Sequence, residues 1–299
     1  MENLKKSERI SILRGGFSDE REISILTANQ VCKELKQKYN TTIIDVGSDC
    51  KKFVNDLIDS KPTKVFNCLH GFFGEDGQVQ SFLNYLKIPY THSGVLSSSL
   101  AMNKILSKVF YESLNIKYPK TIKKKEQLSS NSFPIIAKPI CGGSSNGLVK
   151  IENNAQLLNL EKKRPSNIFY EEFIKGRELT VGILDNKICG IMEIIFESEL
   201  YDFTNKYVNI AKHVIDPPLS SNIKQKICEI SLKVHNNLNC NCLSRLDFRY
   251  NTVLDEVFLL EINTQPGLTE NSLLPEMAKS KGISFLELCE IILSYAKCE

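Results

Sequence analysis

Strands and helices alternate through the first 95 residues of this 299-residue chain, and this alternation limits the fold more than any other feature. Apolar runs at 9–14, 41–46 and 63–70 predict strands, with a helical pattern after the first and the last of them. Strands separated by helices form a mostly parallel sheet with helices on its faces. Ligands bind such sheets at the carboxyl ends of the strands. We therefore expect an open α/β layer whose binding edge lies near Gly15 and His70.

The segment FSDEREIS after the first strand carries a helix-start signal. Asp19 and Glu22, three residues apart, form a capping-box pattern, so we expect a helix to begin near Asp19. The unpaired backbone N–H groups at such a start would face a ligand bound beyond the strand.

From residue 96 the pattern becomes that of an α+β protein. The segment 98–114 predicts one helix, and 133–140, 148–151 and 166–174 predict strands. Later segments predict an amphipathic helix, two paired strands (CLSRLDFRY and EVFLLEIN) and a closing helix. We therefore expect a chain of several domains, since its length is enough for two or three.

Charge and composition exclude several classes of protein. The formal net charge of +3, from 38 basic and 35 acidic residues, is too balanced to indicate binding to nucleic acid or to a membrane surface. No apolar run approaches the roughly 18 residues of a membrane span, and MENLKKSER lacks the apolar core of a secretion signal. The ten cysteines have no paired ligand spacing, so we expect reduced core residues. These observations predict a cytoplasmic protein.

The stretch LLEINTQPGLT ends a predicted strand with polar residues two apart. Glu261 and Asn263 therefore share one face of the strand, and Asp247 lies on the strand before it. If the strands pair, three oxygen side chains converge, and oxygen ligands suit Mg²⁺. A polar face at a sheet edge is the alternative. The apolar flank FLLEI counts against that alternative, because an unpaired buried carboxylate is costly.

Two basic residues are placed to meet anions. Lys138 lies inside an apolar strand, so its ammonium must reach water or an anion. The loop Gly142–Gly147 after it resembles a phosphate-binding loop, although it lacks GxxxxGK[ST] and an ordinary hairpin turn is the alternative. Arg245 shares a face with Asp247 and suits an oxyanion or a phosphoryl group, or else a salt bridge to Asp247 or Glu261. By themselves, Glu171 and Glu178 look like solvated surface charges.

Eight segments, in order and with fitting spacing, resemble the D-alanine–D-alanine ligases of the ATP-grasp superfamily. They are GGFSDEREIS, LHGFFGEDG, IPYTHSGVLSSSLAMNK, AKPICGGSSNG, EEFIKGRELTV, YDFTNKY, SRLDF and EINTQPGLTENSLLP. The resemblance covers nearly the whole chain. It implies three domains: an N-terminal α/β layer at 1–95, a central ATP-grasp part at 96–180, and a C-terminal part at 181–299 with the metal site and a lid loop.

The resemblance also assigns a nucleotide role to some residues and a metal role to others. Those at ATP would be Lys104 and Lys138 at the phosphates, Glu171 and the backbone of Ile174 at the adenine, and Glu178 at the ribose. Those at two Mg²⁺ (or Mn²⁺) ions would be Asp247, Glu261 and Asn263. Phosphoryl transfer depends mainly on positioning and charge neutralisation, which these residue types supply.

The implied reaction joins two D-alanine molecules for peptidoglycan synthesis. The first carboxylate attacks the γ-phosphate of ATP, and the second amine attacks the resulting acyl phosphate. Arg245 and the N–H of Gly267 would stabilise the oxyanion. By the resemblance, Glu20 would bind the first ammonium and form a hydrogen-bonded trio with Ser144 and Tyr207, and His70 would lie beside the first substrate. Ser272 and Lys206 would bind the second carboxylate. Lys206 also belongs to the nucleotide-binding set. The stretch 201–207 would close as a lid that excludes water.

The chain departs from the family pattern at two places. Gly142 stands where relatives usually carry Glu, and Thr204-Asn205 replaces Glu-Ala in the lid. We expect both to affect rate and affinity rather than identity, and the family implies a homodimer.

Three alternatives stay open from the sequence. A D-alanine–D-lactate or D-alanine–D-serine ligase would share these motifs, although Tyr207 favours the dipeptide former. A non-catalytic nucleotide-binding module would have lost a metal ligand or Arg245, and all are present. A nicotinamide-dependent dehydrogenase would show GxGxxG after the first strand, which is missing.

Overall fold

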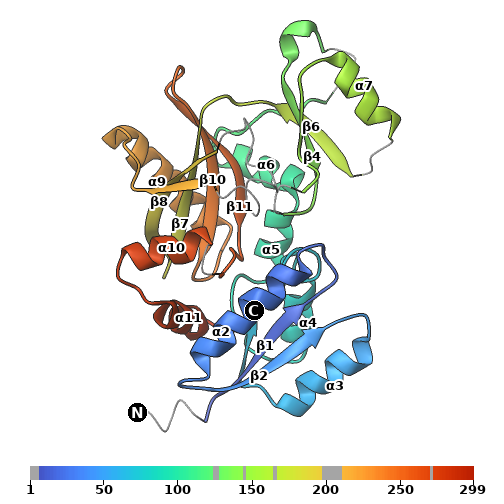
Figure 1. Cartoon of the computed structure of the whole chain (residues 1–299), viewed down its shortest axis with the longest axis vertical. Helices are drawn as coiled ribbons and strands as arrows, with labels where there is room; N and C mark the ends of the chain where they lie inside the picture. Colours follow the sequence, from blue (N-terminus) through green and yellow to red (C-terminus); the bar gives the residue numbers. More distant parts are fainter. Residues whose placement is uncertain (1–6, 124–127, 144–145, 164–166, 197–210, 270–271) are drawn as a thin grey trace.

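The described part of the chain folds into three sheets with helices around them (Figure 1). The computed structural model describes residues 7–123, 128–143, 146–163, 167–196, 211–269 and 272–299. A parallel sheet comes first, and two antiparallel sheets follow it, so the fold is α/β with α+β parts, as the sequence predicts. Within the described ranges no helix is long and apolar enough to cross a membrane.

The first sheet is the predicted open parallel layer. Its strands are β1 (Arg9–Gly15), β2 (Asn40–Val46) and β3 (Lys64–Asn67), in the order β2-β1-β3. The helices of this part are α2 (Arg21–Leu35), α3 (Cys50–Ser60) and α4 (Gln78–Tyr85). Strand β1 is buried over nearly its whole length, as expected for the central strand of a covered parallel sheet.

The predicted capping box at Asp19 is wrong. Helix α2 begins at Arg21, its N-cap is Glu20, and no side chain caps it. The turn before it is held by Ser18, whose hydroxyl accepts the N–H of Glu20 (3.2 Å) and whose carbonyl accepts the N–H of Arg21 (3.2 Å). Asp19 instead accepts a hydrogen bond from Asn146 (3.1 Å). A contact with a distant loop therefore replaces the local cap.

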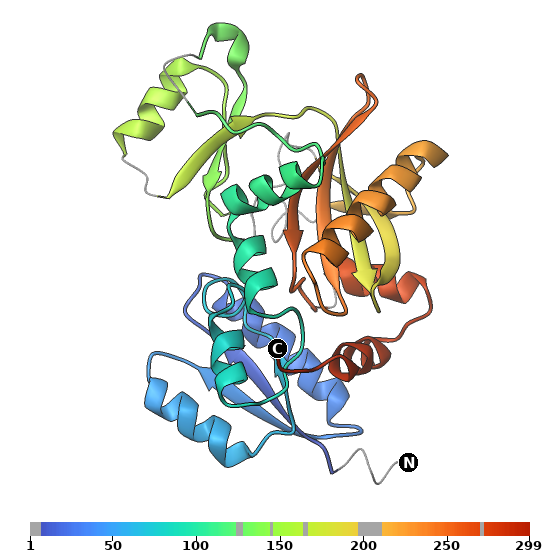
Figure 2. The same cartoon turned by 180° about the vertical axis from the view of Figure 1, so that it is seen from behind.

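The single helix predicted at 98–114 is two helices, α5 (Val95–Met102) and α6 (Lys104–Ser113). Asn103 interrupts them because its Oδ1 accepts the N–H groups of Ile105 and Leu106, which makes it the N-cap of α6. The N–H of Lys104 donates to the carbonyl of Ile140 (2.9 Å). Seen from behind, the two helices connect the N-terminal sheet with the upper part of the molecule (Figure 2).

The central sheet is antiparallel, in the order β5-β4-β6. It consists of β4 (Ile135–Pro139), β5 (Val149–Ile151) and β6 (Ile168–Glu172), preceded by the short 3₁₀ helix η2 (Ser130–Ser132). Helix α7 (Asn154–Lys162), which we did not predict, connects β5 to β6. Its N-cap is Asn153, whose side chain accepts the N–H of Gln156 (3.0 Å).

The largest sheet has the order β11-β10-β7-β8-β9. Its strands are β7 (Arg177–Leu184), β8 (Lys187–Ile195), β9 (Lys212–Ile215), β10 (Ser244–Asn251) and β11 (Glu256–Asn263). The antiparallel pair β10–β11 confirms the predicted pairing. Strand β7 contains the expected boundary between residues 180 and 181. The domain limits stay a prediction.

Three further helices belong to the C-terminal part of the described chain, and the last of them returns it to the N-terminal sheet. They are α9 (Ser221–Asn237), α10 (Leu273–Ser280) and α11 (Phe285–Ser294). Helix α11 packs on α2, where Glu290 accepts from Lys38 (2.7 Å) and from Tyr39 (3.1 Å) (Figure 1). Apolar residues of β1, α2 and α11 belong to one buried cluster. The first and last segments therefore share a core and fix the position of the sheets between them.

Candidate functional site

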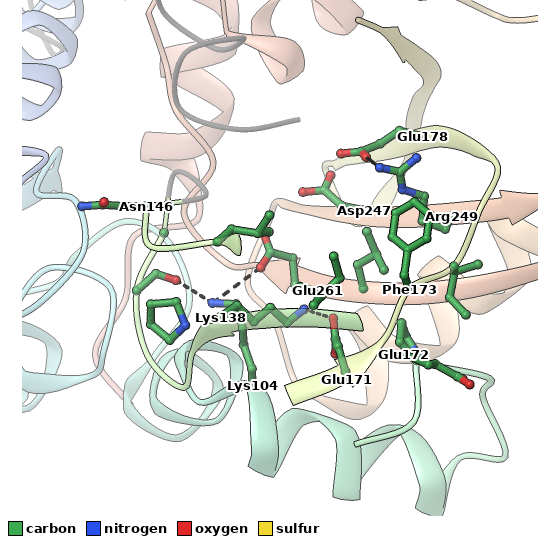
Figure 3. A pocket seen from close by; sticks show the side chains of 18 residues that line it. Lys104, Lys138, Asn146, Glu171, Glu172, Phe173, Glu178, Asp247, Arg249 and Glu261 are labelled. Atoms are coloured by element: carbon green, nitrogen blue, oxygen red, sulfur yellow. Dashed lines mark hydrogen bonds and ion pairs between the residues drawn. The ribbon is translucent and has the colours of Figure 1, made fainter. Parts of the chain in front are cut away.

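A pocket lies between the central sheet and the strands β10 and β11 (Figure 3). It has ≈ 840 Å³ of empty space, part of it open to solvent. Six of its charged lining residues come from five strands and a helix: Lys104 on α6, Lys138 on β4, Glu171 on β6, Glu178 on β7, and Asp247 with Glu261 on β10 and β11. These six residues and Ile174, all predicted from the sequence, therefore line one cavity.

The side chains of Arg245, Asp247, Glu261 and Asn263 share one face of the β10–β11 pair, which we call the β10–β11 face. In the antiparallel register Asp247 is opposite Glu261 and Arg245 is opposite Asn263. A bulge at Leu260 interrupts the ladder next to these pairs. The predicted convergence of three oxygen side chains from two strands is therefore what the register produces.

Asp247 is held on this face by two neighbours. Arg245 donates to both of its carboxylate oxygens, from Nε to Oδ1 (3.0 Å) and from Nη2 to Oδ2 (2.8 Å). The hydroxyl of Thr180, opposite Asp247 on β7, also donates to Oδ1 (2.7 Å). The salt bridge that we considered for Arg245 is thus present, and Arg245 itself is not among the residues that line the pocket. Thr180 carries no signal in the sequence, because only the pairing of β7 with β10 brings it here.

Lys104 joins this face to the glycine-rich loop. Its Nζ lies 3.6 Å from Glu261 Oε2 and donates to the carbonyl of Gly142 (2.6 Å) (Figure 3). Lys104 and the glycine-rich loop, both predicted to bind phosphate, are therefore hydrogen-bonded to each other.

The β10–β11 face fits a hard divalent cation. The atoms on this face that could bind a metal are oxygens, from the carboxylates of Asp247 and Glu261 and from the amide of Asn263. The Asn263 Oδ1 also accepts the N–H of Gln265 (2.8 Å). In the described part of the chain no three His, Cys, Asp or Glu side chains are grouped as metal ligands. Two carboxylates and an amide would therefore need further oxygens from a substrate, which is the usual arrangement for Mg²⁺ at phosphates.

Lys138 and Glu171 form the second charged part of the pocket, and both are buried. The Lys138 ammonium lies 2.7 Å from Glu171 Oε1, which confirms that this lysine meets an anion (Figure 3). The view of Glu171 as a solvated surface charge is wrong, because only 3% of the residue is exposed. Its other oxygen accepts from Lys108 (2.5 Å), which the sequence analysis missed. Lys108 has the spacing of an ordinary helix residue, so no sequence signal marks it.

Glu178 lies further along the pocket and is also paired rather than solvated. Arg249 Nη2 is 2.9 Å from Glu178 Oε2, and only about a tenth of either side chain is exposed. Both residues line the pocket together with Phe173 and Ile174 (Figure 3). This end of the pocket therefore has an apolar wall near the carboxylate of Glu178, as a base and a sugar would require.

The N-terminal edge, which we define as Glu20, His70, Gly71 and Glu75, lies beside the glycine-rich loop. A Cβ added to Gly71 or to Gly143 would come within 3.1 Å of Glu20 Oε2, so the carboxylate lies against both loops. Gly71 also has a φ of +67°. The N-terminus of α2 favours an anion such as Glu20, which in turn is positioned to meet a cation.

His70 is buried and its Nδ1 lies 2.8 Å from Glu75 Oε1. Burial disfavours the imidazolium, but the hydrogen bond and charge of Glu75, with the charge of Glu20, raise the pKa of His70. Burial also raises the pKa of the Glu75 carboxyl. The predicted edge near His70 therefore holds a buried histidine–carboxylate pair rather than a plain strand end.

Gly267 and Ser272 lie together after β11. A Cβ on Gly267 would lie 2.9 Å from Ser272 Oγ, which also accepts the N–H of Thr269 (3.0 Å). Ser144, Lys206, Tyr207 and the expected lid at 201–207 lie outside the described residues.

Gln265, another residue that the sequence analysis missed, connects β11 with the N-terminal sheet. It is 2% exposed and donates to the carbonyls of Leu69 and, at 3.3 Å, Asn67. The amide of Asn67 donates back to its Oε1 (2.9 Å). The end of the β10–β11 face is thus tied to the loop that carries His70.

Comparisons with known proteins agree with this geometry. The family model described as "D-ala D-ala ligase C-terminus" matches residues 103–294. The chain is 42% identical to a D-alanine–D-alanine ligase of Pelagibacter ubique, covering 97% of this chain and 98% of the relative. It is 35% identical to that of Rhodospirillum rubrum, with 98% and 99% covered.

Two solved structures are also similar. The D-alanine–D-alanine ligase of Bacillus anthracis complexed with ATP superposes with a TM-score of 0.82 at 29% identity, covering 97% of each chain. The ligase of Coxiella burnetii, at 23% identity and a TM-score of 0.78, covers 97% of this chain and 94% of its own, and shares the fold.

Proposed function

The chain belongs to the D-alanine–D-alanine ligase family, and we propose that it joins two D-alanine molecules while ATP is converted to ADP and phosphate. The observation that carries the proposal is the facing pair Asp247 and Glu261 in one pocket with Lys104 and Lys138. Two carboxylates for a metal and two lysines for phosphates form the set that phosphoryl transfer needs. The dipeptide would supply peptidoglycan synthesis in the cytoplasm, where ATP is available.

We assign the nucleotide to the pocket between the central sheet and β10–β11. Its phosphates would lie near Lys104 and Lys138, its adenine near Glu171 and the backbone of Ile174, and its ribose near Glu178. The apolar wall at Phe173 and Ile174 supports the placement of the base at that end. That the similar Bacillus anthracis structure is complexed with ATP supports the choice of nucleotide.

Asp247, Glu261 and Asn263 would hold Mg²⁺ or Mn²⁺, with room for two ions as in the family. When bound, the ions would neutralise charge on the transferred phosphoryl group. Thr180 and Arg245 hold Asp247 in place, and Lys104 lies against Glu261. These contacts keep the ligands oriented before the substrate arrives.

The first step forms an acyl phosphate. Glu20 would bind the ammonium group of the first D-alanine, with His70 at its border, and so aim its carboxylate at the γ-phosphorus. An oxygen of the carboxylate forms the new P–O bond as the bond to ADP breaks. The positive charges of Lys104, Lys138 and Arg245 would stabilise the negative charge on the phosphoryl group during this transfer.

The second step forms the peptide bond. The amine of the second D-alanine attacks the acyl carbon, and Arg245 with the N–H of Gly267 stabilises the oxyanion until phosphate leaves. Ser272, beside Gly267, would place the second carboxylate together with Lys206. By the resemblance, Ser144 and Tyr207 act with Glu20 to close the site against water.

The relatives named above favour D-alanine as the second substrate over D-lactate or D-serine. We also propose a homodimer, which light scattering on the purified protein would test. A mass of one chain at micromolar concentration would contradict it.

The function is tested by ADP release and by identification of the product. We expect ADP release that depends on both D-alanine and Mg²⁺, with D-alanyl-D-alanine as the product and no ester when D-lactate is added. Glu261→Ala should reduce the rate sharply, because it removes a metal ligand. Lys117→Ala, at a surface ion pair with Glu256, is the control. ADP release without D-alanine, or full activity of Glu261→Ala, would overturn the proposal.

A further inference from the structure

The lysine–glutamate cluster, defined as Lys108, Lys138 and Glu171, holds two ammonium groups on one buried carboxylate. Lys108 Nζ binds Glu171 Oε2 at 2.5 Å, and Lys138 Nζ binds Oε1 at 2.7 Å. All three side chains are at most 8% exposed. The cluster therefore carries one positive charge in excess in a place where charge is costly, so it favours the arrival of an anion.

Lys108 has no donor left for a ligand. Its three ammonium hydrogens have three acceptors, namely Glu171, the carbonyl of Pro119 (2.6 Å) and the hydroxyl of Thr121 (3.2 Å). The ring of Phe169 lies 4.9 Å from the nitrogen. Burial lowers the pKa of Lys108, although the charge of Glu171 opposes this. Lys108 is also absent from the pocket lining, so its position serves Glu171 rather than a substrate.

Lys138 is placed differently although it binds the same carboxylate. It lines the pocket, and Glu171 is its acceptor among the described residues (Figure 3). An ammonium has three donors, so Lys138 can take further acceptors from a ligand in the pocket. The two lysines thus divide into one that is enclosed and one that faces the cavity.

We propose that Lys108 is a positioning residue that keeps Glu171 paired, so that Lys138 can move from Glu171 to the phosphates when the nucleotide binds. This inference rests on the proposed function of the pocket. With Lys108 present, the departure of Lys138 leaves Glu171 with a counter-charge and an orientation suited to the adenine. Without Lys108, the same departure would leave an unpaired carboxylate in a buried site, which is strongly unfavourable.

The test compares binding of ATP with binding of adenosine, which lacks phosphates. Lys108→Met should weaken binding of ATP with Mg²⁺ by about tenfold or more, because Lys138 is then needed by Glu171. Adenosine does not require Lys138 to move, so its dissociation constant should stay within about threefold. Isothermal titration calorimetry measures both, and Lys117→Met at the surface should change neither.

A double variant separates this role from a structural one. Lys108→Met/Glu171→Gln removes the carboxylate that would retain Lys138, so it should bind ATP more tightly than Lys108→Met and about as tightly as Glu171→Gln. Should Lys108→Met fail to fold, Lys108→Gln keeps a donor for the Pro119 carbonyl and should show the same contrast.

Three results would overturn the inference: unchanged ATP binding in the Lys108 variants, equal losses for ATP and adenosine, or no recovery in the double variant. These differ from failure of the proposed function. In that case the unaltered protein itself would bind no ATP or would release no ADP with D-alanine.

Discussion

The β10–β11 face and the N-terminal edge hold their charged side chains in different ways. On the β10–β11 face, four side chains project from adjacent strands, and register alone places Asp247 opposite Glu261. On the N-terminal edge, Glu20 lies at the start of α2 without capping it, and His70 and Glu75 lie on the loop after a parallel strand. The first arrangement is rigid by pairing, whereas the second depends on contacts from elsewhere, such as Gln265. We therefore expect substitutions on the β10–β11 face to affect the chemical step and metal binding. Substitutions near the N-terminal edge should affect binding of the first substrate and the stability of the fold.

The largest effect should come from Arg245→Ala on the β10–β11 face. It removes the proposed oxyanion donor and the partner of Asp247, so kcat should fall by about 10²–10³-fold. Steady-state ADP release measures it, and Arg9→Ala, far from the pocket, should be unaffected. A change in kcat of less than threefold would show that the β10–β11 face does not carry the chemistry.

Thr180→Val tests whether the face depends on its supporting contacts. The variant loses the hydroxyl that donates to Asp247 Oδ1 (2.7 Å). The Mg²⁺ concentration for half-maximal rate should rise by about 10–100-fold, the usual effect of losing a partner of a metal ligand. Thr180→Ser keeps the hydroxyl and should behave as the parent. An unaltered Mg²⁺ titration would show that Arg245 alone orients Asp247.

Gln265→Leu tests the link between the two regions. The carbonyl of Leu69 loses its buried donor, which costs about 1–3 kcal/mol and loosens the His70 loop. We expect KM for D-alanine to rise by up to about tenfold, while KM for ATP stays the same. Gln225→Leu, on the exposed side of α9, is the matched control. Equal rises for both substrates would mean that Gln265 supports the fold as a whole rather than the edge.

The smallest effect at neutral pH should come from His92→Asn, near the N-terminal edge. Burial, with the nearby His70, lowers the pKa of His92 to about 3. The unfolded chain therefore takes up a proton near pH 6.5 that the folded protein refuses, so stability falls as the pH falls below 6.5. This titration should lower the free energy of unfolding by about 2 kcal/mol between pH 7 and pH 5.

Asn tolerates the φ of +72° at residue 92 and does not titrate, so the variant should lose this part of the acid dependence. Urea unfolding at both pH values measures the difference. The contribution of His235, whose pKa burial lowers to about 4, should remain. If the variant were as acid-sensitive as the parent, groups other than His92 would cause the acid dependence.

Local patterns predicted the parts of the molecule that depend on neighbours in the chain. Two-residue spacing placed Arg245 with Asp247 on one strand and Glu261 with Asn263 on the next, because a strand has a period of two. The register of β10 with β11 then brought both pairs to one face. Lys138 in an apolar strand was expected to reach water or an anion, and it meets the carboxylate of Glu171. The capping box at Asp19 failed because Asn146, 127 residues away, takes that carboxylate.

The sequence by itself determined the α/β start, the antiparallel pair and the residue types for phosphate chemistry, since these follow from periodicity and from the cost of burying charge. Only the tertiary structure decided that Lys108 joins Glu171, that Thr180 supports Asp247 and that Gln265 reaches the His70 loop. Lys108 and Glu171 are 63 positions apart, and Gln265 and Leu69 are 196 apart. No local pattern encodes such pairs, because the partner of a buried polar group is chosen by the packing of whole elements.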